Sequence, residues 1–132
     1  MTRTSYNPSA ALTFPGMSQL VASGGFVFLA GQCSMDEDAQ LVGQDDPSAQ
    51  ARQIFRNIEA LLAAEGGTLA DIVRLTCFAV SPAAYEAYAK VKAEIFASEG
   101  PAGTTVIVKA LLNPRFLLEV EATAVRSGRE HP

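Results

Sequence analysis

The stretch from Phe116 to Val125, FLLEVEATAV, alternates with a period of two between two sets of side chains. One set is apolar throughout, whereas the other contains Glu119, Glu121 and Thr123. Successive side chains of a strand point to opposite faces of a sheet, so the pattern predicts a strand with one face packed on a core. The opposite face, which carries the two glutamates, must meet either water or another subunit.

The other strands are predicted from apolar and β-branched stretches that lie between turn residues. Residues 19–23 and 26–30 flank two glycines, which reach the positive φ that a two-residue hairpin turn requires. Residues 72–80 carry apolar side chains on both faces, which is typical of a central strand covered on both sides. Residues 104–108 predict one more strand before the final one.

Two helices are predicted, and each begins with a capping residue followed by proline. The pairs are Asp46-Pro47 and Ser81-Pro82, in which a side-chain oxygen caps free amides and proline tolerates the first helical position. Apolar residues then recur at spacings of three and four, as in amphipathic helices. The first stripe is Ala51, Ile54, Phe55, Ile58, Leu61 and Leu62, and the second is Tyr85, Tyr88, Val91, Ile95 and Phe96.

These elements give the order ββαβαββ. Two amphipathic helices pack side by side on only one face of such a sheet. We therefore expect an α+β fold with a mixed β-sheet, two helices on one face, and a single domain over residues 1–132.

Composition limits the classes of function. Hydrophobic residues make up 48% of the 132 residues and charged residues 18%, which is enough apolar mass for a core and some surplus for a homo-oligomer. The net charge of −4 and the pI of about 4.9 argue against a nucleic-acid partner. No apolar run approaches the ~20 residues that span a bilayer, so we expect no membrane partner and a cytoplasmic protein.

Few residue types are present that bind metals or act as nucleophiles. His131 is the single histidine, so a zinc site, a Ser-His mechanism and a Cys-His mechanism are all disfavoured, and no metal or cofactor is expected. Cys33 and Cys77 are too few for a disulfide scaffold and are interpreted as small buried apolar residues.

Glu119 and Glu121 are paired carboxylates on one strand face, with side chains roughly 7 Å apart. Two interpretations stay open at this point. One glutamate orients water as a base, or both are solvated strand residues. Arg115 either pairs with Glu119 or belongs to the preceding turn.

Several stretches in order resemble one family, RidA/YjgF, which is also called L-PSP endoribonuclease-like. The resemblance spans nearly everything from Gly16 to Val125. Its stretches are Phe26 to Gln32 (FVFLAGQ), Gln50 to Leu61 (QARQIFRNIEAL) with Asn57, Gly67 to Phe78 (GTLADIVRLTCF), Pro101-Ala102, and Glu119 to Val125 (EVEATAV).

The resemblance implies a chorismate-mutase-like protomer in a homotrimer. The sheets of the trimer build a central barrel, and a small-molecule cleft lies between neighbouring subunits. Active members hydrolyse reactive 2-imino or enamine acids to 2-oxo acids and ammonia. The family's water-orienting glutamate matches Glu119, and its cleft glycine matches Gly31.

The signature arginine of the family, which binds the substrate carboxylate with a planar fork, is replaced here by Gly103. Three further cleft positions also differ: a tyrosine corresponds to Met17, an asparagine to Ala89 and a cysteine to Thr105. Thr104 and Thr105 can offer hydroxyls to a ligand, and either can instead be satisfied within the sheet.

Loss of a bidentate charged contact costs a few kcal/mol, so simple 2-imino acids are expected to be poor substrates. Gly103 opens space for a bulkier or uncharged ligand. The sequence therefore supports a trimeric deaminase-type hydrolase for another substrate, with Glu119 as base. The alternative is a non-catalytic trimer that binds a metabolite, whereas ribonuclease activity is disfavoured by the acidic composition.

Overall fold

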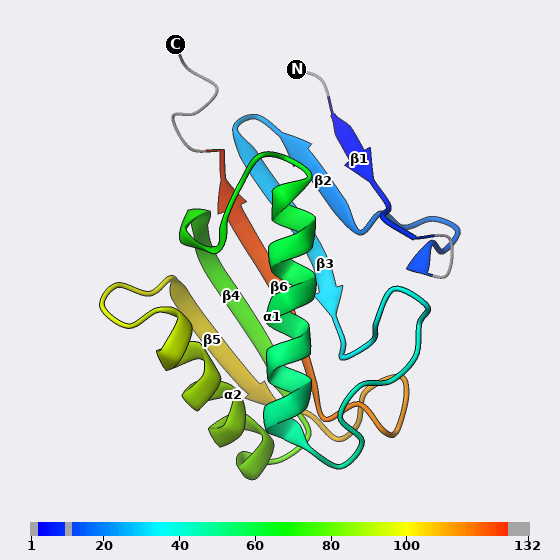
Figure 1. Ribbon diagram of the computed structural model, residues 1–132, viewed down its shortest axis with the longest axis vertical. Helices are drawn as coiled ribbons and strands as arrows, with labels where there is room; N and C mark the ends of the chain where they lie inside the picture. The colour runs from blue at the N-terminus through cyan, green and yellow to red at the C-terminus, as the bar shows by residue number, and fades with distance from the viewer. Residues whose placement is uncertain (1–2, 10–11, 127–132) are drawn as a thin grey trace.

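The computed structural model describes residues 3–9 and 12–126 (Figure 1). Within this part, one six-stranded sheet has the order β1-β2-β3-β6-β4-β5. The strands are β1 (Thr4–Tyr6), β2 (Leu20–Ser23), β3 (Phe26–Gln32), β4 (Ile72–Ala79), β5 (Ala102–Ile107) and β6 (Leu118–Val125). Helices α1 (Pro47–Ala63) and α2 (Pro82–Ile95) lie side by side on one face of the sheet, and the short 3-10 helix η2 (Leu69–Asp71) precedes β4.

The predicted α+β fold and the order of its main elements are confirmed. The sequence did not predict β1, whose three exposed residues are too few to show a period and which pairs antiparallel with β2. The β2–β3 hairpin turns through Gly24 and Gly25, at φ of 61° and 84°. Both glycines thus adopt the left-handed backbone that the turn requires.

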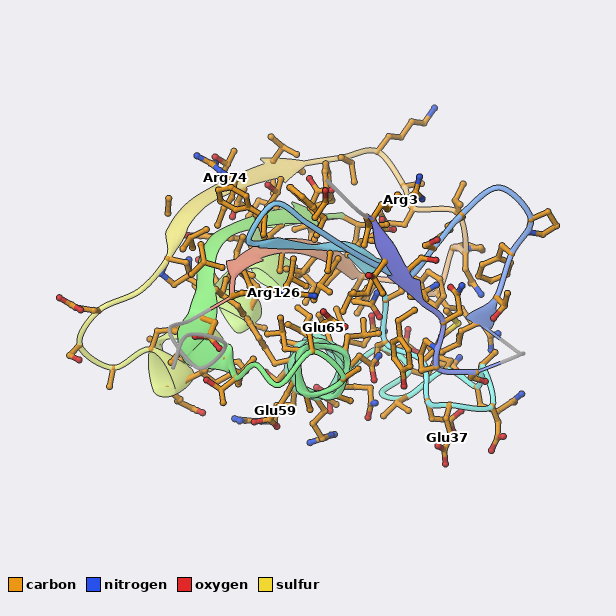
Figure 2. The ribbon with its side chains drawn as sticks, turned by 90° about the horizontal axis from the view of Figure 1, so that it is seen from above. Arg3, Glu37, Glu59, Glu65, Arg74 and Arg126 are labelled. Atoms are coloured by element: carbon orange, nitrogen blue, oxygen red, sulfur yellow. The ribbon has the colours of Figure 1, made fainter. Side chains whose placement is uncertain are left out.

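The two helix starts are capped as predicted. The Asp46 side chain accepts a hydrogen bond from the Ala49 amide at 3.0 Å, and the Ser81 hydroxyl accepts one from the Ala84 amide at 3.1 Å. All six apolar stripe residues of α1 are buried against the sheet, whereas in α2 the buried stripe residues are Tyr88 and Val91. An ion pair between Arg126 and Glu65 joins the end of β6 to the segment after α1 (Figure 2).

The alternation of β6 divides the sheet into two faces. Leu118, Val120, Ala122 and Ala124 are buried beneath the helices. No element of the described residues covers the other face, here called the open face, which carries Glu119 and Glu121 (Figure 2).

The prediction that β4 is covered on both sides is not met within one chain. Thr76 and Phe78 of β4 lie half-buried on the open face. Phe26, Phe28 and Val106 on the same face are 45%, 46% and 42% exposed. An apolar face of this kind on the protomer requires a partner or a large contact with water.

Candidate active site

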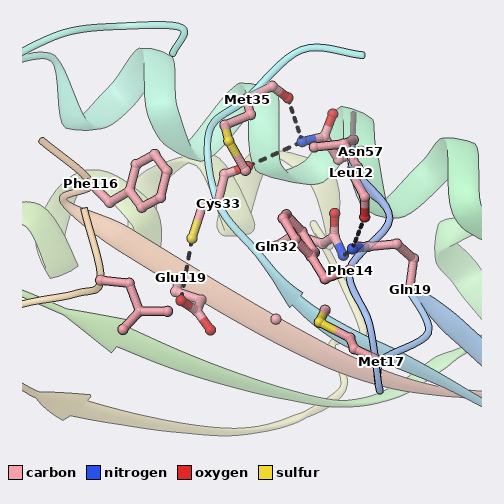
Figure 3. Close-up of a pocket in the computed structure, with 12 residues that line it drawn as sticks. Leu12, Phe14, Met17, Gln19, Gln32, Cys33, Met35, Asn57, Phe116 and Glu119 are labelled. Atoms are coloured by element: carbon pink, nitrogen blue, oxygen red, sulfur yellow. Dashed lines mark hydrogen bonds between the residues drawn. The ribbon is translucent and has the colours of Figure 1, made fainter. Parts of the chain in front are cut away.

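A cavity of about 380 Å³ opens beside the end of β3 and the start of β6 (Figure 3). The pairing of these strands shifts between Leu29 and Gln32, as at a β-bulge, and Gln32 pairs again with Val120. The described residues that line the cavity are Leu12, Phe14, Met17, Gln19, Gly31, Gln32, Cys33, Met35, Asn57, Leu112, Phe116 and Glu119. Glu119 is the only carboxylate among them, and most of the others are apolar.

The Glu119 carboxylate is held by a thiol. Cys33 Sγ donates a hydrogen bond to Glu119 Oε1 at 3.2 Å. Burial, together with the nearby Glu119 charge, raises the pKa of the Cys33 thiol above its usual range, so the sulfur keeps its proton and remains a donor. One carboxylate oxygen is thereby fixed, and no donor among the described residues reaches the other.

Gly31 makes room for the second oxygen. A Cβ on residue 31 would lie 2.9 Å from Glu119 Cδ and 3.0 Å from Cγ, and would overlap Oε2. The carboxylate therefore lies against the bare backbone of Gly31, in space that any other residue would fill. A glycine is required here because of close approach and not because of positive φ.

The walls of the cavity are fixed by side-chain amides. Asn57 of α1 donates to the carbonyl oxygens of Cys33 and Met35 at 3.2 and 2.9 Å. Gln32 donates to Gln19 Oε1 at 2.9 Å, and Gln19 donates to the Leu12 carbonyl at 2.9 Å. These bonds tie the segment before β2 and the segment after β3 to the rigid helix and sheet.

Gln50 of α1 holds the turn before β6, which forms another rim of the cavity. It is fully buried, donates to the carbonyls of Gly43 and Arg115 at 3.0 and 3.1 Å, and accepts from the Leu117 amide at 2.9 Å. The turn that carries Leu112 and Phe116 is thus joined to the first turn of the helix.

The predicted site residues fall into groups within one chain. Met17 and Gly31 line the cavity with Glu119. Gly103 and Thr105 pair with Leu75 and Cys77, which are buried under the helices, so they lie on the helix-covered face. This follows because directly paired residues of neighbouring strands share a face.

The other predicted residues lie outside the cavity. Ala89 is on α2, over the same helix-covered face as Gly103 and Thr105. Thr104 pairs with Thr76 and lies on the open face, in the row of Glu121. Thr105 lies beside Cys77, with which it pairs across β5 and β4.

Neither Arg115 nor Glu121 lines the cavity with Glu119. The Arg115 side chain is exposed, its amide donates to Asn113 Oδ1 at 2.9 Å, and no ion pair with Glu119 exists among residues 3–9 and 12–126. Arg115 is thus a turn residue.

Among residues 3–9 and 12–126, no group of three or more His, Cys, Asp or Glu could hold a metal ion. His131 lies outside the described residues.

Sequence reasoning missed Cys33, Gln50 and the hydrogen-bonding role of Asn57. The signal for Cys33 was available, because residues 31 and 33 of an extended strand share a face. Gln50 had a weaker signal: it precedes the apolar stripe at Ala51 and stands one turn before Ile54, toward the side of the helix that is buried.

The fold and the cavity define the class, an α+β protomer of the YjgF type with a carboxylate beside a cavity glycine. The family model described as Endoribonuclease L-PSP matches residues 8–126, and the chain belongs to this family, the RidA/YjgF family. A RutC family protein of Pyrococcus horikoshii is 33% identical over 109 residues, which cover 83% of this chain and 86% of that protein.

Solved structures of other proteins have a similar fold. Rv2704 of Mycobacterium tuberculosis, described as a member of the YjgF/YER057c/UK114 family, has a TM-score of 0.81 at 31% identity and covers 94% of this chain and 99% of its own. Yeast Mmf1 has a TM-score of 0.87 at 28% identity, with 96% and 100% covered. No described helix of the protein is both long and apolar enough to cross a membrane.

Proposed function

We propose that the protein hydrolyses a small imine or enamine with an apolar substituent bulkier than those of the simplest 2-imino acids. The observation that carries the proposal is the Glu119 carboxylate, with Oε1 bound to Cys33 and Oε2 left without a donor at the cavity. A carboxylate with one fixed oxygen can accept a proton from water through the other. Glu119 is therefore the general base that activates water.

The lining of the cavity supports the size and character of the substrate. Phe14, Met17, Leu112 and Phe116 offer apolar surface, and cavities of this volume accept small organic molecules. Water activated by Glu119 adds to the imine carbon, and the resulting amino alcohol then loses ammonia to leave a carbonyl. Water is the only co-reactant that this hydrolysis requires.

A trimer supplies the rest of the site in this proposal. The cavity and the group of Ala89, Gly103 and Thr105 lie on different faces of one protomer, so a single chain does not unite them. A ring in which the α2–β5 edge of one copy meets the Glu119 cavity of the next would do so. The apolar open face would line the central barrel, and the two free cysteines suit a reducing cytoplasm.

Because the proposed trimer dissociates on dilution, the thermal stability of the protein should depend on its concentration. We expect the midpoint of thermal unfolding to fall by several degrees on dilution from about 100 to 1 µM, because dissociated protomers expose Phe26 and Phe28. Sedimentation velocity gives the species present at each concentration. A stable monomer throughout this range would contradict the assembly.

The catalytic proposal is tested with the imine that an amino-acid oxidase forms from leucine, with 2-iminobutyrate as the small comparison. Wild type should hydrolyse the leucine-derived imine above the solvent rate and 2-iminobutyrate little or not at all. Glu119→Gln should lower the first rate by about 10²-fold or more. Glu121→Gln, on the same strand face outside the cavity, is the matched control and should retain activity.

A non-catalytic metabolite-binding trimer is the second candidate, favoured by the absence of any cation among the described residues that line the cavity. It predicts that wild type binds 4-methyl-2-oxopentanoate, the expected product, but hydrolyses neither imine, and that Glu119→Gln strengthens this binding, because a carboxylate repels the anion and donates no hydrogen bond to it. Binding unchanged in Glu119→Gln, together with no hydrolysis, would contradict both candidates.

A further inference from the structure

Lys92 places an ammonium group beside Gly103. A Cβ on residue 103 would lie 3.5 Å from Lys92 Nζ, and the next atom it would meet is the Leu75 carbonyl oxygen at 3.9 Å. Lys92 stands in the last turn of α2, three residues after Ala89, so both side chains lie on one side of the helix. The absence of a side chain at residue 103 leaves the ammonium open to approach from the β5 edge.

The Lys92 charge has no carboxylate partner among the described residues. The ion pairs of residues 3–9 and 12–126 are Arg52 with Glu94 and Arg126 with Glu65. Lys92 Nζ instead lies 5.3 Å from the centre of the Tyr88 ring, a cation–π contact that positions the ammonium without neutralising it.

The polar neighbours of Lys92 are neutral. Burial raises the pKa of Cys77 to about 12, even though Lys92 and a hydrogen bond from Thr105 act in the opposite direction, so Cys77 is an uncharged thiol at pH 7. Thr105, which is also uncharged, pairs with Cys77 across β5 and β4. A half-buried ammonium with a glycine beside it can bind an anion.

We propose that Lys92 is the anion-binding residue of the cleft and receives the carboxylate of the substrate in the space left by Gly103. The inference rests on the proposed function, because the cavity and the Lys92 edge belong to one cleft only in the assembly. In this proposal Lys92 supplies a positive charge for the carboxylate where the family arginine is absent.

The geometry also explains why the simplest 2-imino acids would be poor substrates. An ammonium is a compact point charge, whereas a guanidinium binds both carboxylate oxygens in a fixed plane. A ligand held at one point needs a second anchor to fix its reacting carbon against Glu119. An apolar substituent in the cavity beside Met17 and Phe116 supplies that anchor.

Binding of 4-methyl-2-oxopentanoate, followed by ligand-observed NMR and calorimetry, tests the assignment. Lys92→Gln should weaken binding by about tenfold or more, and added salt should weaken binding to wild type more than to the variant. Lys90→Gln is the matched control: the same change, on the same helix, at an exposed residue, and it should bind like wild type. The uncharged ketone 4-methylpentan-2-one should bind wild type and Lys92→Gln equally.

The variants separate this inference from the proposed function. Equal affinity of wild type and Lys92→Gln for the oxo acid, in a protein where Glu119→Gln changes that affinity, overturns the role of Lys92 alone. Loss of affinity in Lys92→Gln with no effect of Glu119→Gln overturns the proposed site and leaves an anion site at Lys92. A lower unfolding temperature with unchanged affinity would make Lys92 a residue of helix stability and overturn the inference.

Discussion

Replacing Gly31 with alanine is expected to remove the function of Glu119 while leaving the fold nearly as stable as wild type. The added Cβ would occupy the place of Glu119 Oε2 and approach Cδ to 2.9 Å. The end of the Glu119 side chain is held by a single hydrogen bond from Cys33, so the carboxylate moves more easily than the backbone. A displacement near 1 Å of a catalytic group costs about a hundredfold in rate, which is the loss we expect for the leucine-derived imine.

Cys33 reports the same displacement without any substrate. Burial is the main cause of the raised pKa of the Cys33 thiol, and the Glu119 charge and its hydrogen bond also contribute to it. Moving the carboxylate away lowers that pKa, so more thiolate is present at a given pH and the thiol reacts faster with a disulfide reagent such as DTNB. Cys77 is fully buried and should stay unreactive in both proteins.

Gly100→Ala is the matched control. Its Cβ would meet only the Cβ of Phe96, at 3.7 Å, which is ordinary van der Waals contact. We therefore expect wild-type activity and wild-type thiol reactivity from this variant. If Gly31→Ala keeps both properties of wild type, Glu119 does not depend on the space beside Gly31, and the described site is wrong.

The sequence predicted the features that depend on local patterns. The period of two in β6 identified its buried and open faces, and the capping pairs at Asp46 and Ser81 placed both helix starts correctly. These signals are strong because backbone geometry alone dictates them. The short strand β1 gave no such signal, because its pairing with β2 decides its conformation.

The candidate site was predicted less completely, for a different reason. Glu119 was a candidate from its strand face and from the resemblance, and Gly31 from the resemblance, but the hydrogen bond from Cys33 depends on the register shift of β3 after Leu29. The separation of Gly103 from Glu119 follows from register: Gly103 pairs with Leu75, whereas Glu119 pairs with Phe78, which points to the other face. The register between strands that are far apart in the sequence cannot be read from the residues of either strand alone.

Gln50→Leu should cost about 2–4 kcal/mol of folding stability, although it places an apolar side chain of similar size in a buried position. The change leaves the Arg115 carbonyl without a donor and the Leu117 amide without an acceptor, whereas the Gly43 carbonyl still accepts from the Asp46 amide. Each orphaned group costs about 1–3 kcal/mol when water cannot reach it, and burial of the leucine offsets part of this. Urea unfolding monitored by circular dichroism measures the loss.

Gln50→Glu tests whether donation or acceptance matters more. Its carboxylate can still accept from the Leu117 amide, but it cannot donate to the two carbonyls and would place a charge in a fully buried position. We expect it to be at least as destabilising as Gln50→Leu at pH 7 and less so in mild acid, where the protonated carboxyl recovers one donor. Gln44→Leu, at an exposed loop position, should change stability by less than about 0.5 kcal/mol.

The same amides connect stability to the site. Without Gln50, the turn that carries Leu112 and Phe116 loses its bonds to α1, and the Leu117 amide should exchange with solvent far faster than in wild type. Binding of 4-methyl-2-oxopentanoate should then weaken because this rim must be ordered again on binding. A Gln50→Leu protein with wild-type stability and a protected Leu117 amide would show that other contacts hold the rim.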